Sequence, residues 1–178
     1  MLDYKNLPIG ENAPALVNAV VEIPKYSTNK YEYDANLGVF RLDRVLHSAV
    51  YYPADYGFIP NTIIDDGDPL DLLIFISGPT FPGCVLEVRP IGKLNMVDNK
   101  GSDEKILAVA QHDPRYSHIE DLKNVEPHVL KEIEQFFNIY KSLENKLTCT
   151  FGWSSKDDAL KRIDTCRVKQ NRGPNQSR

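Results

Sequence analysis

Four aspartates stand within seven residues of this 178-residue chain, in the segment DDGDPLD at 65–71. The glycine and the proline inside it bend the backbone, so the carboxylates of Asp66, Asp68 and Asp71 can point at one place. Two carboxylates about 4 Å apart repel each other by about 4 kcal/mol at an effective dielectric constant of about 20, so a cation must compensate them. Carboxylate oxygens select hard cations, with Mg²⁺ first. The segment therefore predicts a magnesium site.

Two other interpretations of this segment remain open: a solvated acidic turn without a ligand, and a calcium loop. The calcium loop fits poorly, because the sixth position counted from Asp66 is Asp71, where glycine is needed. The twelfth position is Ser77, where the calcium loop has glutamate.

A second acidic segment, at 98–104, lies in a turn between two strand-like segments and carries Asp98 and Asp103. Alone it is typical of an ordinary hairpin loop. Loops at one end of a barrel can meet, however, and together with the turn at 65–71 this segment could hold more than one metal ion.

Cationic and phenolic side chains that could bind an anion are spread along the chain. A lone lysine or arginine is usually a surface residue, and a tyrosine on an apolar helix face usually packs in the core. Lys30 and Glu32 alternate in KYEYD and so share one face of a strand. The candidates are Lys30, Arg44, Lys105, Lys141, Tyr56 and Tyr140, with Glu22 and Glu32 as further acids.

The composition is that of an ordinary soluble globule, with 42% hydrophobic and 26% charged residues. No apolar run approaches the about 20 residues that span a bilayer, and the first residues show no secretory signal. Three cysteines without a paired spacing favour a reducing compartment, so we expect a cytoplasmic protein that binds no membrane. The net charge of -4 argues against a nucleic-acid partner.

Short strand-like segments separated by Gly and Pro turns fill residues 18 to 109, which predicts a barrel or sandwich rather than alternating strands and helices. The expected strands are 18–23, 30–34, 39–43, 72–76, 84–92, 105–109 and 147–153. The segment YYPADYGF at 51–58 is interpreted as an aromatic turn.

Two helices are expected in the C-terminal third. The first lies within 126–144, with Pro127 in its first turn. Its apolar face is expected to carry Val129, Ile133, Phe136, Tyr140 and Leu143. The second begins after Ser155, which can cap it with Asp158 three residues on. Its buried side is expected to carry Leu160, Ile163 and Cys166.

We expect one domain over residues 1–178, since this length suffices for a single core and no linker interrupts it. Residues 1–15 are interpreted as an N-terminal extension and residues 168–178 as a polar, disordered tail.

Together these segments resemble the family I soluble inorganic pyrophosphatases. DGDPLDL at 66–72 matches the Asp-x-Asp-Pro-x-Asp signature of that family. Further blocks occur in the order and spacing of the family: VEIP at 21–24, KYE at 30–32, Asp43-Arg44, YYPADYGFIPNT at 51–62, Asp98 with Asp103 and Lys105, and Tyr140-Lys141. The resemblance covers roughly residues 7–160.

The resemblance implies a mainly β (α+β) fold, a closed OB-like five-stranded β-barrel with two main α-helices packed outside. It implies a hydrolase of phosphate metabolism that splits pyrophosphate into two orthophosphates with Mg²⁺ and a metal-activated water. Short bacterial members of the family are usually hexamers and longer eukaryotic ones dimers, so a homohexamer is expected.

The resemblance also assigns roles to residues. Asp66, Asp71 and Asp103 would ligate the first Mg²⁺, Asp71 would be shared with a second, and Asp98 with Asp103 would hold a metal ion that arrives with the substrate. Asp68 would be the general base, supported by Tyr56. The phosphates would be bound by Lys30, Arg44, Tyr56, Lys105, Tyr140 and Lys141. Glu22 and Glu32 would be auxiliary metal positions. The family often has an acid after Asp98, where this chain has Asn99.

The chemistry agrees with this interpretation. Pyrophosphate is strongly anionic and repels a nucleophile, and metal ions with nearby cations neutralise that charge. Two rival classes remain: a metal-dependent nucleotide phosphohydrolase, which needs an aromatic slot for the base, and an OB-type nucleic-acid-binding module. The second would show exposed aromatic residues among basic ones, whereas the loops here are acidic.

Overall fold

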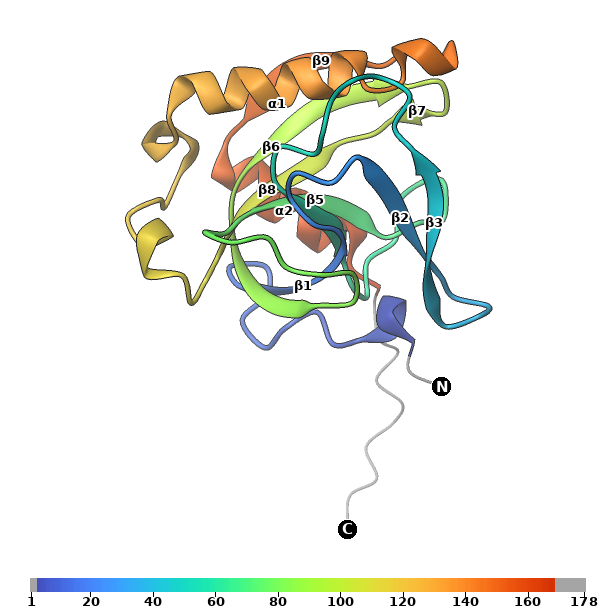
Figure 1. Ribbon diagram of the computed structural model, residues 1–178. Helices are drawn as coiled ribbons and strands as arrows, with labels where there is room; N and C mark the ends of the chain where they lie inside the picture. The colour runs from blue at the N-terminus through green and yellow to red at the C-terminus, as the bar shows by residue number, and fades with distance from the viewer. Residues whose placement is uncertain (1–2, 169–178) are drawn as a thin grey trace.

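A ring of five strands forms the centre of the structure, a computed structural model that describes residues 3–168 (Figure 1). The order around the ring is β1 (Val17–Ile23), β4 (Asp55–Ile59), β5 (Leu70–Phe75), β8 (Lys105–Ala110) and β6 (Val85–Asp98), which pairs again with β1. Strands β5 and β8 run parallel and the other neighbours antiparallel. Closure leaves the ring without a free edge. The predicted mainly β, five-stranded closed fold is confirmed.

Four further strands extend this framework. Strands β2 (Asn29–Asp34) and β3 (Val39–Val45) form a separate two-stranded sheet, which stands beside the ring in Figure 1. The end of β6 folds back on β7 (Gly101–Ser102), and β9 (Cys149–Ser154) pairs with the same long strand. Strand β6 runs on to Asp98, beyond the expected end at residue 92, so the second acidic segment sits on a hairpin at its tip.

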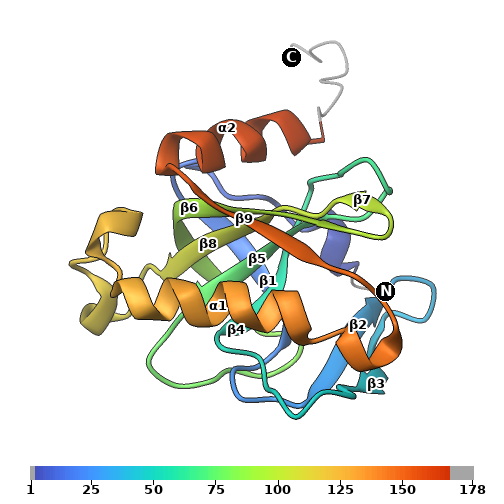
Figure 2. The same cartoon turned by 90° about the horizontal axis from the view of Figure 1, so that it is seen from above.

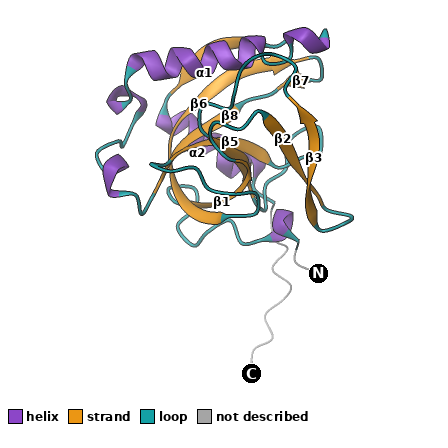
Figure 3. Ribbon diagram, in the orientation of Figure 1, coloured by secondary structure: helices purple, strands orange, loops and turns teal. Residues whose placement is uncertain are grey.

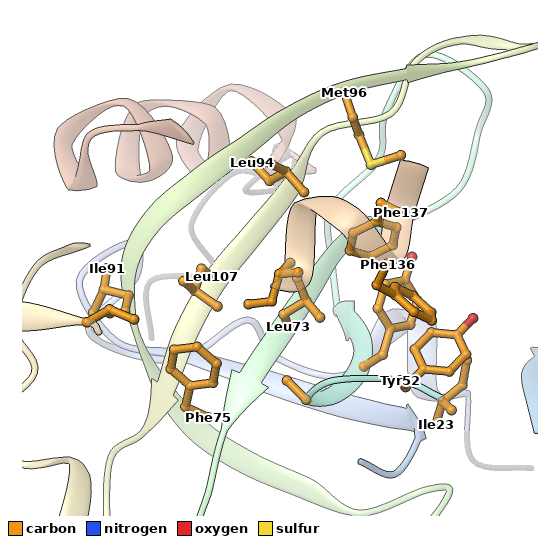
Figure 4. Close-up of a cluster of buried hydrophobic side chains, with 14 of the residues drawn as sticks. Ile23, Tyr52, Leu73, Phe75, Ile91, Leu94, Met96, Leu107, Phe136 and Phe137 are labelled. Carbon is orange, nitrogen blue, oxygen red and sulfur yellow. The ribbon is translucent and has the colours of Figure 1, made fainter. Parts of the chain in front are cut away.

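Two helices cover the outside of the ring, α1 (Pro127–Ile139) and α2 (Lys156–Cys166), and Figure 2 shows strands between them. Successive side chains of β5 and β8 point to opposite faces of the sheet and so contact different helices. Leu72 and Ile106 pack with α2, whereas Leu73 and Leu107 pack with α1. Burial of one such side chain contributes about 1.5–3 kcal/mol. Figure 4 shows the α1 side of this core, where Phe136 and Phe137 lie close to Leu73.

The strand β4 corrects the sequence interpretation, because residues from Asp55 onward form a strand rather than the expected aromatic turn. All five of its residues are buried, since it pairs with β1 on one side and β5 on the other. Gly57 is required there: a Cβ atom at this position would lie 1.9 Å from the carbonyl oxygen of Val20.

The first helix is shorter than expected. It ends at Ile139, and residues Ser142–Glu144 form a 3₁₀ turn that Asn145 closes in a left-handed conformation (φ 55°). Leu143 therefore points to solvent, with 66% of its surface exposed. The prediction that it lies on the apolar face of the helix was wrong. Tyr140 is buried as expected.

The second helix begins as predicted, because the Ser155 hydroxyl accepts a hydrogen bond from the backbone N–H of Asp158 (3.2 Å). Its buried residues are Ala159, Ile163 and Cys166, whereas Leu160 is only half-buried.

The remaining elements are short 3₁₀ turns, drawn as small helices in Figure 3: Tyr4–Asn6, Pro114–Tyr116, Leu122–Asn124 and Ser142–Glu144. No helix among residues 3–168 is both long and apolar enough to cross a membrane. The expected tail at 168–178 lies, apart from Val168, outside the described residues, and the single-domain organisation stays a prediction.

Candidate active site

A pocket of about 600 Å³ gathers the clustered acids and most of the candidate cations, and we call it the acidic pocket. Its walls come from β1, β2, β4, the turn at 64–71, the β6–β7 hairpin, the start of β8 and the chain after α1. Of the candidates predicted from the sequence, it is lined by Glu22, Lys30, Glu32, Tyr56, Asp66, Asp68, Asp71, Asp98, Asp103, Lys105, Tyr140 and Lys141. The sequence blocks that looked unrelated along the chain therefore meet in one place.

A buried lysine lies at the centre of the acidic pocket. Lys105 is only 2% exposed, and its Nζ donates to Asp71 Oδ2 at 2.6 Å and to Asp103 Oδ1 at 2.5 Å. Burial alone would lower the pKa of Lys105, but the two carboxylates outweigh it and raise that pKa, so the ammonium stays charged. The first residue of β8 thus marks the point where negative charge is densest.

The same oxygen of Asp71 accepts a second hydrogen bond, from the Tyr56 hydroxyl at 2.6 Å. Asp71 is the second residue of β5 and pairs in register with Phe58 of β4, two residues beyond Tyr56. Burial, together with the charge of Asp71, raises the pKa of Tyr56 well above its ordinary value. Tyr56 therefore stays neutral and donates its hydroxyl hydrogen to Asp71.

The β6–β7 hairpin brings Asp98 to the end of α1. Lys141 Nζ donates to Asp98 Oδ2 at 3.1 Å, and the backbone N–H of Lys100 donates to Oδ1 at 2.7 Å. Partial burial would raise the pKa of Asp98, but these donors lower it. Beside this pair, burial and the charge of Asp103 raise the pKa of Tyr140.

The turn at 65–71 is shaped by its own backbone. Gly67 adopts a positive φ of 87°, and its N–H donates to the Ile64 carbonyl at 2.9 Å. The backbone N–H of Asp68 donates to Asp66 Oδ1 at 3.1 Å, and Asp66 and Asp68 are both exposed. Local turn chemistry thus presents these two carboxylates to solvent at the rim.

Three further candidates line the acidic pocket from β1 and β2. Lys30 contacts Glu32, as their alternation on β2 predicted, and its Nζ also lies 3.3 Å from Asp43. Glu22 on β1 accepts from the backbone N–H of Tyr33 at 2.8 Å. Burial, only partly offset by that hydrogen bond, raises the pKa of Glu22 to about 8.

Arg44 is the one candidate that does not line the acidic pocket. Its Nε donates to Glu144 Oε1 at 2.8 Å, and its guanidinium also contacts Asp43. The turn after α1 therefore holds it, and its contact with phosphate stays a prediction.

Sequence reasoning missed five ionisable residues of the acidic pocket that the structure adds: Lys5, Tyr33, Asp65, Lys100 and Arg162. Asp65 and Lys100 lie inside the two acidic segments, so those segments could have indicated them. Lys5 carried no local signal, because it belongs to the residues interpreted as an extension.

A larger hollow of about 790 Å³ lies between α1 and the loop at 49–53. Apolar and aromatic side chains such as Tyr26, Tyr51 and Phe75 line much of it, and none of the clustered aspartates does. Its size therefore does not make it the site of phosphate chemistry.

The carboxylates suit a hard divalent cation, but they do not form a finished ligand set. Among residues 3–168, no three Asp, Glu, His or Cys side chains are grouped to hold a metal ion. Asp66, Asp68 and Asp71 share one pocket rather than the expected single point, because each has its own partner: the Asp68 N–H for Asp66, Lys5 for Asp68 and Lys105 for Asp71. The oxygen donors still open into one cavity, so the chemistry fits Mg²⁺.

Comparison with known proteins identifies relatives over most of the chain. The family model described as inorganic pyrophosphatase matches residues 19–171. An inorganic pyrophosphatase of a Nostoc species is 51% identical over 163 residues, which are 92% of this chain and 96% of that protein. The inorganic pyrophosphatase of Thermus thermophilus is 47% identical over 169 residues, 93% of this chain and 97% of that protein.

Solved structures agree with the sequence matches. The crystal structure of the inorganic pyrophosphatase from Thermus thermophilus superposes with a TM-score of 0.92 at 44% identity, covering 97% of this chain and 100% of that one. The inorganic pyrophosphatase from Helicobacter pylori gives a TM-score of 0.87 at 39% identity, covering 94% of this chain and 99% of that one.

Proposed function

The chain belongs to the inorganic pyrophosphatase family and hydrolyses pyrophosphate, and we propose that the acidic pocket is where this reaction takes place. The observation that carries the proposal is Lys105, a buried ammonium held between two carboxylates that come from β5 and from the loop before β8. A site of such charge density suits a substrate with two charged ends and no organic body.

Asp66, Asp71, Asp98 and Asp103 would hold Mg²⁺, since their oxygens all line the acidic pocket. When bound, the metal ion neutralises the charge of pyrophosphate and makes water a better nucleophile near neutral pH. Glu22 and Glu32, on the neighbouring strands, would serve as auxiliary positions.

The cations and phenols of the acidic pocket would bind the two phosphates. Lys30, Lys105 and Lys141 come from three different elements and can contact both ends of the anion, with the Tyr56 and Tyr140 hydroxyls as neutral donors. Arg44 would join them by leaving its ion pair with Glu144. These contacts would offset negative charge on the phosphate that leaves.

Asp68 would be the general base. Its carboxylate is exposed on the turn beside the metal-binding aspartates, so water can reach it. It would take a proton from the water whose oxygen attacks phosphorus, while the bridging P–O bond breaks and its electron pair leaves with the second phosphate. General bases typically contribute about 10²- to 10⁴-fold to the rate.

Substrate choice follows from the same contacts. An ester group, as in ATP, would place an uncharged substituent where a phosphate oxygen of pyrophosphate contacts a lysine. That lysine would lose its partner, and an unpaired buried charge costs about 3–5 kcal/mol. Every 1.36 kcal/mol is tenfold in rate, so kcat/KM for pyrophosphate should exceed that for ATP by roughly 10²- to 10⁴-fold.

Phosphate release from pyrophosphate, ATP and p-nitrophenyl phosphate, each with and without Mg²⁺, tests this proposal. We expect rapid release from pyrophosphate alone and only with the metal ion. EDTA should remove activity but leave the far-ultraviolet circular dichroism unchanged, because apolar clusters hold the strands and helices together without a metal ion. Comparable rates on ATP would favour a nucleotide phosphohydrolase, and release without a metal ion would overturn the metal assignment.

We further propose a cytoplasmic homo-oligomer, with a hexamer favoured over a dimer, that binds neither nucleic acid nor membrane. The hexamer is favoured because the chain resembles the short bacterial members of the family and covers 96–97% of the two bacterial relatives named above. Light scattering at several protein concentrations gives the mass, and a mass of one or two chains would contradict the hexamer.

A further inference from the structure

The N-terminal turn supplies a lysine to the rim of the acidic pocket. Lys5 Nζ lies 3.0 Å from Asp68 Oδ1 and donates a hydrogen bond to it, across 63 positions of sequence. The three lysines of the acidic pocket assigned to phosphate have other partners: Lys30 pairs with Glu32 and Asp43, Lys105 with Asp71 and Asp103, and Lys141 with Asp98. Lys5 differs from these three lysines because its partner, Asp68, is the residue proposed as the general base.

The backbone of Lys5 is fixed by contacts on both sides. The backbone N–H of Asn61 donates to the Lys5 carbonyl at 2.7 Å, which ties the turn to the chain that leads into residues 65–71. On the other side, the Lys5 N–H donates to the Asp3 carboxylate at 3.0 Å. Hydrogen bonds therefore hold in place the backbone that carries the Lys5 ammonium.

An aromatic cluster supports the same turn. The ring of Tyr4 packs edge-on against Tyr33 at 5.2 Å and against Phe40 at 5.1 Å between ring centres. The backbone N–H of Tyr4 also donates to the Tyr33 hydroxyl at 3.3 Å. Tyr33 itself lines the acidic pocket, so the support of Lys5 and the wall of the site are one packed unit.

We propose that Lys5 is a positioning residue for pyrophosphate hydrolysis: its ammonium holds one oxygen of Asp68, so that the other oxygen faces the attacking water. This rests on the proposed role of Asp68 as general base. An exposed aspartate on a turn samples several rotamers, and fixing one of them raises the fraction of productive encounters. The Asp68 side chain is 60% exposed, so a partner is needed to fix it.

The solvent exposure of the Lys5–Asp68 pair limits its expected effect on the rate. The Lys5 side chain is 33% exposed, and an exposed ion pair contributes about 0.2–1 kcal/mol, which corresponds to about a two- to fivefold change in rate at the upper end. We therefore expect Lys5→Met to lower kcat by about two- to fivefold and to leave KM unchanged. Lys5→Arg, which keeps a donor and the charge, should restore most of kcat.

The decisive measurement is a double-mutant cycle on kcat with Asp68→Asn, at saturating pyrophosphate and Mg²⁺. If Lys5 acts through Asp68, Lys5→Met should lower kcat in the wild type but not in the Asp68→Asn background. Lys131→Met, on the exposed side of α1, is the matched control and should change neither constant. Equal melting temperatures of the Lys5 variants would show that a folding defect does not cause the effect.

Three results would overturn the inference. A rise of KM at unchanged kcat would make Lys5 a direct phosphate contact. A loss of the same size in the Asp68→Asn background would show that it acts elsewhere, and an unchanged kcat in Lys5→Met would leave it no role. Failure of the proposed function looks different, because Asp68→Asn by itself would then keep normal kcat whatever Lys5→Met does.

Discussion

The aspartates of the acidic pocket and those of a second region, around Asp55 and Asp113, differ in what holds their carboxylates. In the acidic pocket Asp68, Asp71, Asp98 and Asp103 each contact a lysine side chain, which for all but Asp103 comes from a distant part of the chain. In the second region the donors are backbone N–H groups and hydroxyls. Asp55 accepts from the Lys25 N–H at 2.6 Å, the Thr80 N–H at 3.0 Å and the Thr80 hydroxyl at 2.7 Å.

The difference matters because the two kinds of donor cannot move equally. A lysine side chain can swing away when a metal ion or a phosphate arrives, at the cost of changing a few rotamers. A backbone N–H cannot leave without rearranging the fold around it. The lysine-held carboxylates can therefore exchange partners during a reaction, whereas Asp55 and Asp113, whose donors belong to the surrounding backbone and hydroxyls, act in structure. Even Asp98, which has one donor of each kind, keeps an oxygen held by Lys141 alone.

The largest effect is expected from Asp71→Asn. This change removes a charge that compensates Lys105 and that would hold Mg²⁺, so we expect turnover to fall by more than about a thousandfold, since a metal ion supplies several kcal/mol to such reactions. Asp103 still contacts Lys105, so the fold should remain. Titration calorimetry should show weaker Mg²⁺ binding, and an unchanged affinity in a folded variant would contradict the ligand assignment.

Asp68→Asn comes next. If Asp68 is the base rather than a metal ligand, kcat should fall by about 10²- to 10⁴-fold, with little change in Mg²⁺ affinity. Part of the loss should return at higher pH, where hydroxide is more abundant. Steady-state kinetics from pH 7 to 9 test this prediction. A normal kcat of the variant at neutral pH would show that Asp68 is not the general base.

Asp55→Asn should show the opposite pattern, a loss of stability rather than of chemistry. Asp55 is fully buried, and an amide of the same shape turns its NH₂ group toward at least one of the donors that now bind a carboxylate oxygen. Leaving such a donor unsatisfied costs about 1–3 kcal/mol of unfolding free energy. Urea denaturation measures that cost, and kcat of the folded protein at 25 °C should stay within about twofold on the same argument. A large fall in kcat at unchanged stability would show that Asp55 acts in catalysis, and the two regions would then not differ in role.

The smallest effect is expected at Asp113, whose carboxylate accepts from the Ser77 hydroxyl at 2.5 Å and the Ser77 N–H at 2.7 Å. The Ser77 hydroxyl is the main cause that lowers the pKa of Asp113 below its ordinary value. A lowered pKa in the folded state stabilises the fold above the unfolded pKa of about 3.9, and that contribution is lost as the pH falls through the folded pKa.

Ser77→Ala should therefore lower the urea midpoint slightly near pH 6, and the gap to wild type should close as the pH falls below about 4. Thr165→Ala on α2, whose hydroxyl bonds a backbone carbonyl rather than an acid, is the control and should give a gap that does not depend on pH. A constant gap for Ser77→Ala would show that the hydroxyl does not bind the charged carboxylate.

Local pattern was enough to predict most elements and the acids of the site. Short segments rich in β-branched and aromatic residues, separated by Gly and Pro turns, located seven of the strands, helical spacing located α1 and α2, and the spacing in DGDPLD indicated a metal-binding turn. Each of these signals lies within one stretch of chain, where backbone geometry fixes which side chains share a face. The errors came where the local signal is ambiguous. Strand β4 is buried on both sides and shows no alternation, and α1 ends before Leu143 although the apolar spacing continues.

Only the tertiary structure decided the cation–acid pairs that join distant parts of the chain. Lys105 and Asp71 are 34 positions apart, Lys141 and Asp98 are 43 apart, and Lys5 and Asp68 are 63 apart. Such pairs form only when the ring closes and the N-terminal turn packs on Tyr33, so no spacing in the sequence encodes them. The sequence by itself determined that the chain carries a dense acidic turn in need of positive charge. Closure of the ring determined that lysines provide that charge, because it places them within reach of the carboxylates.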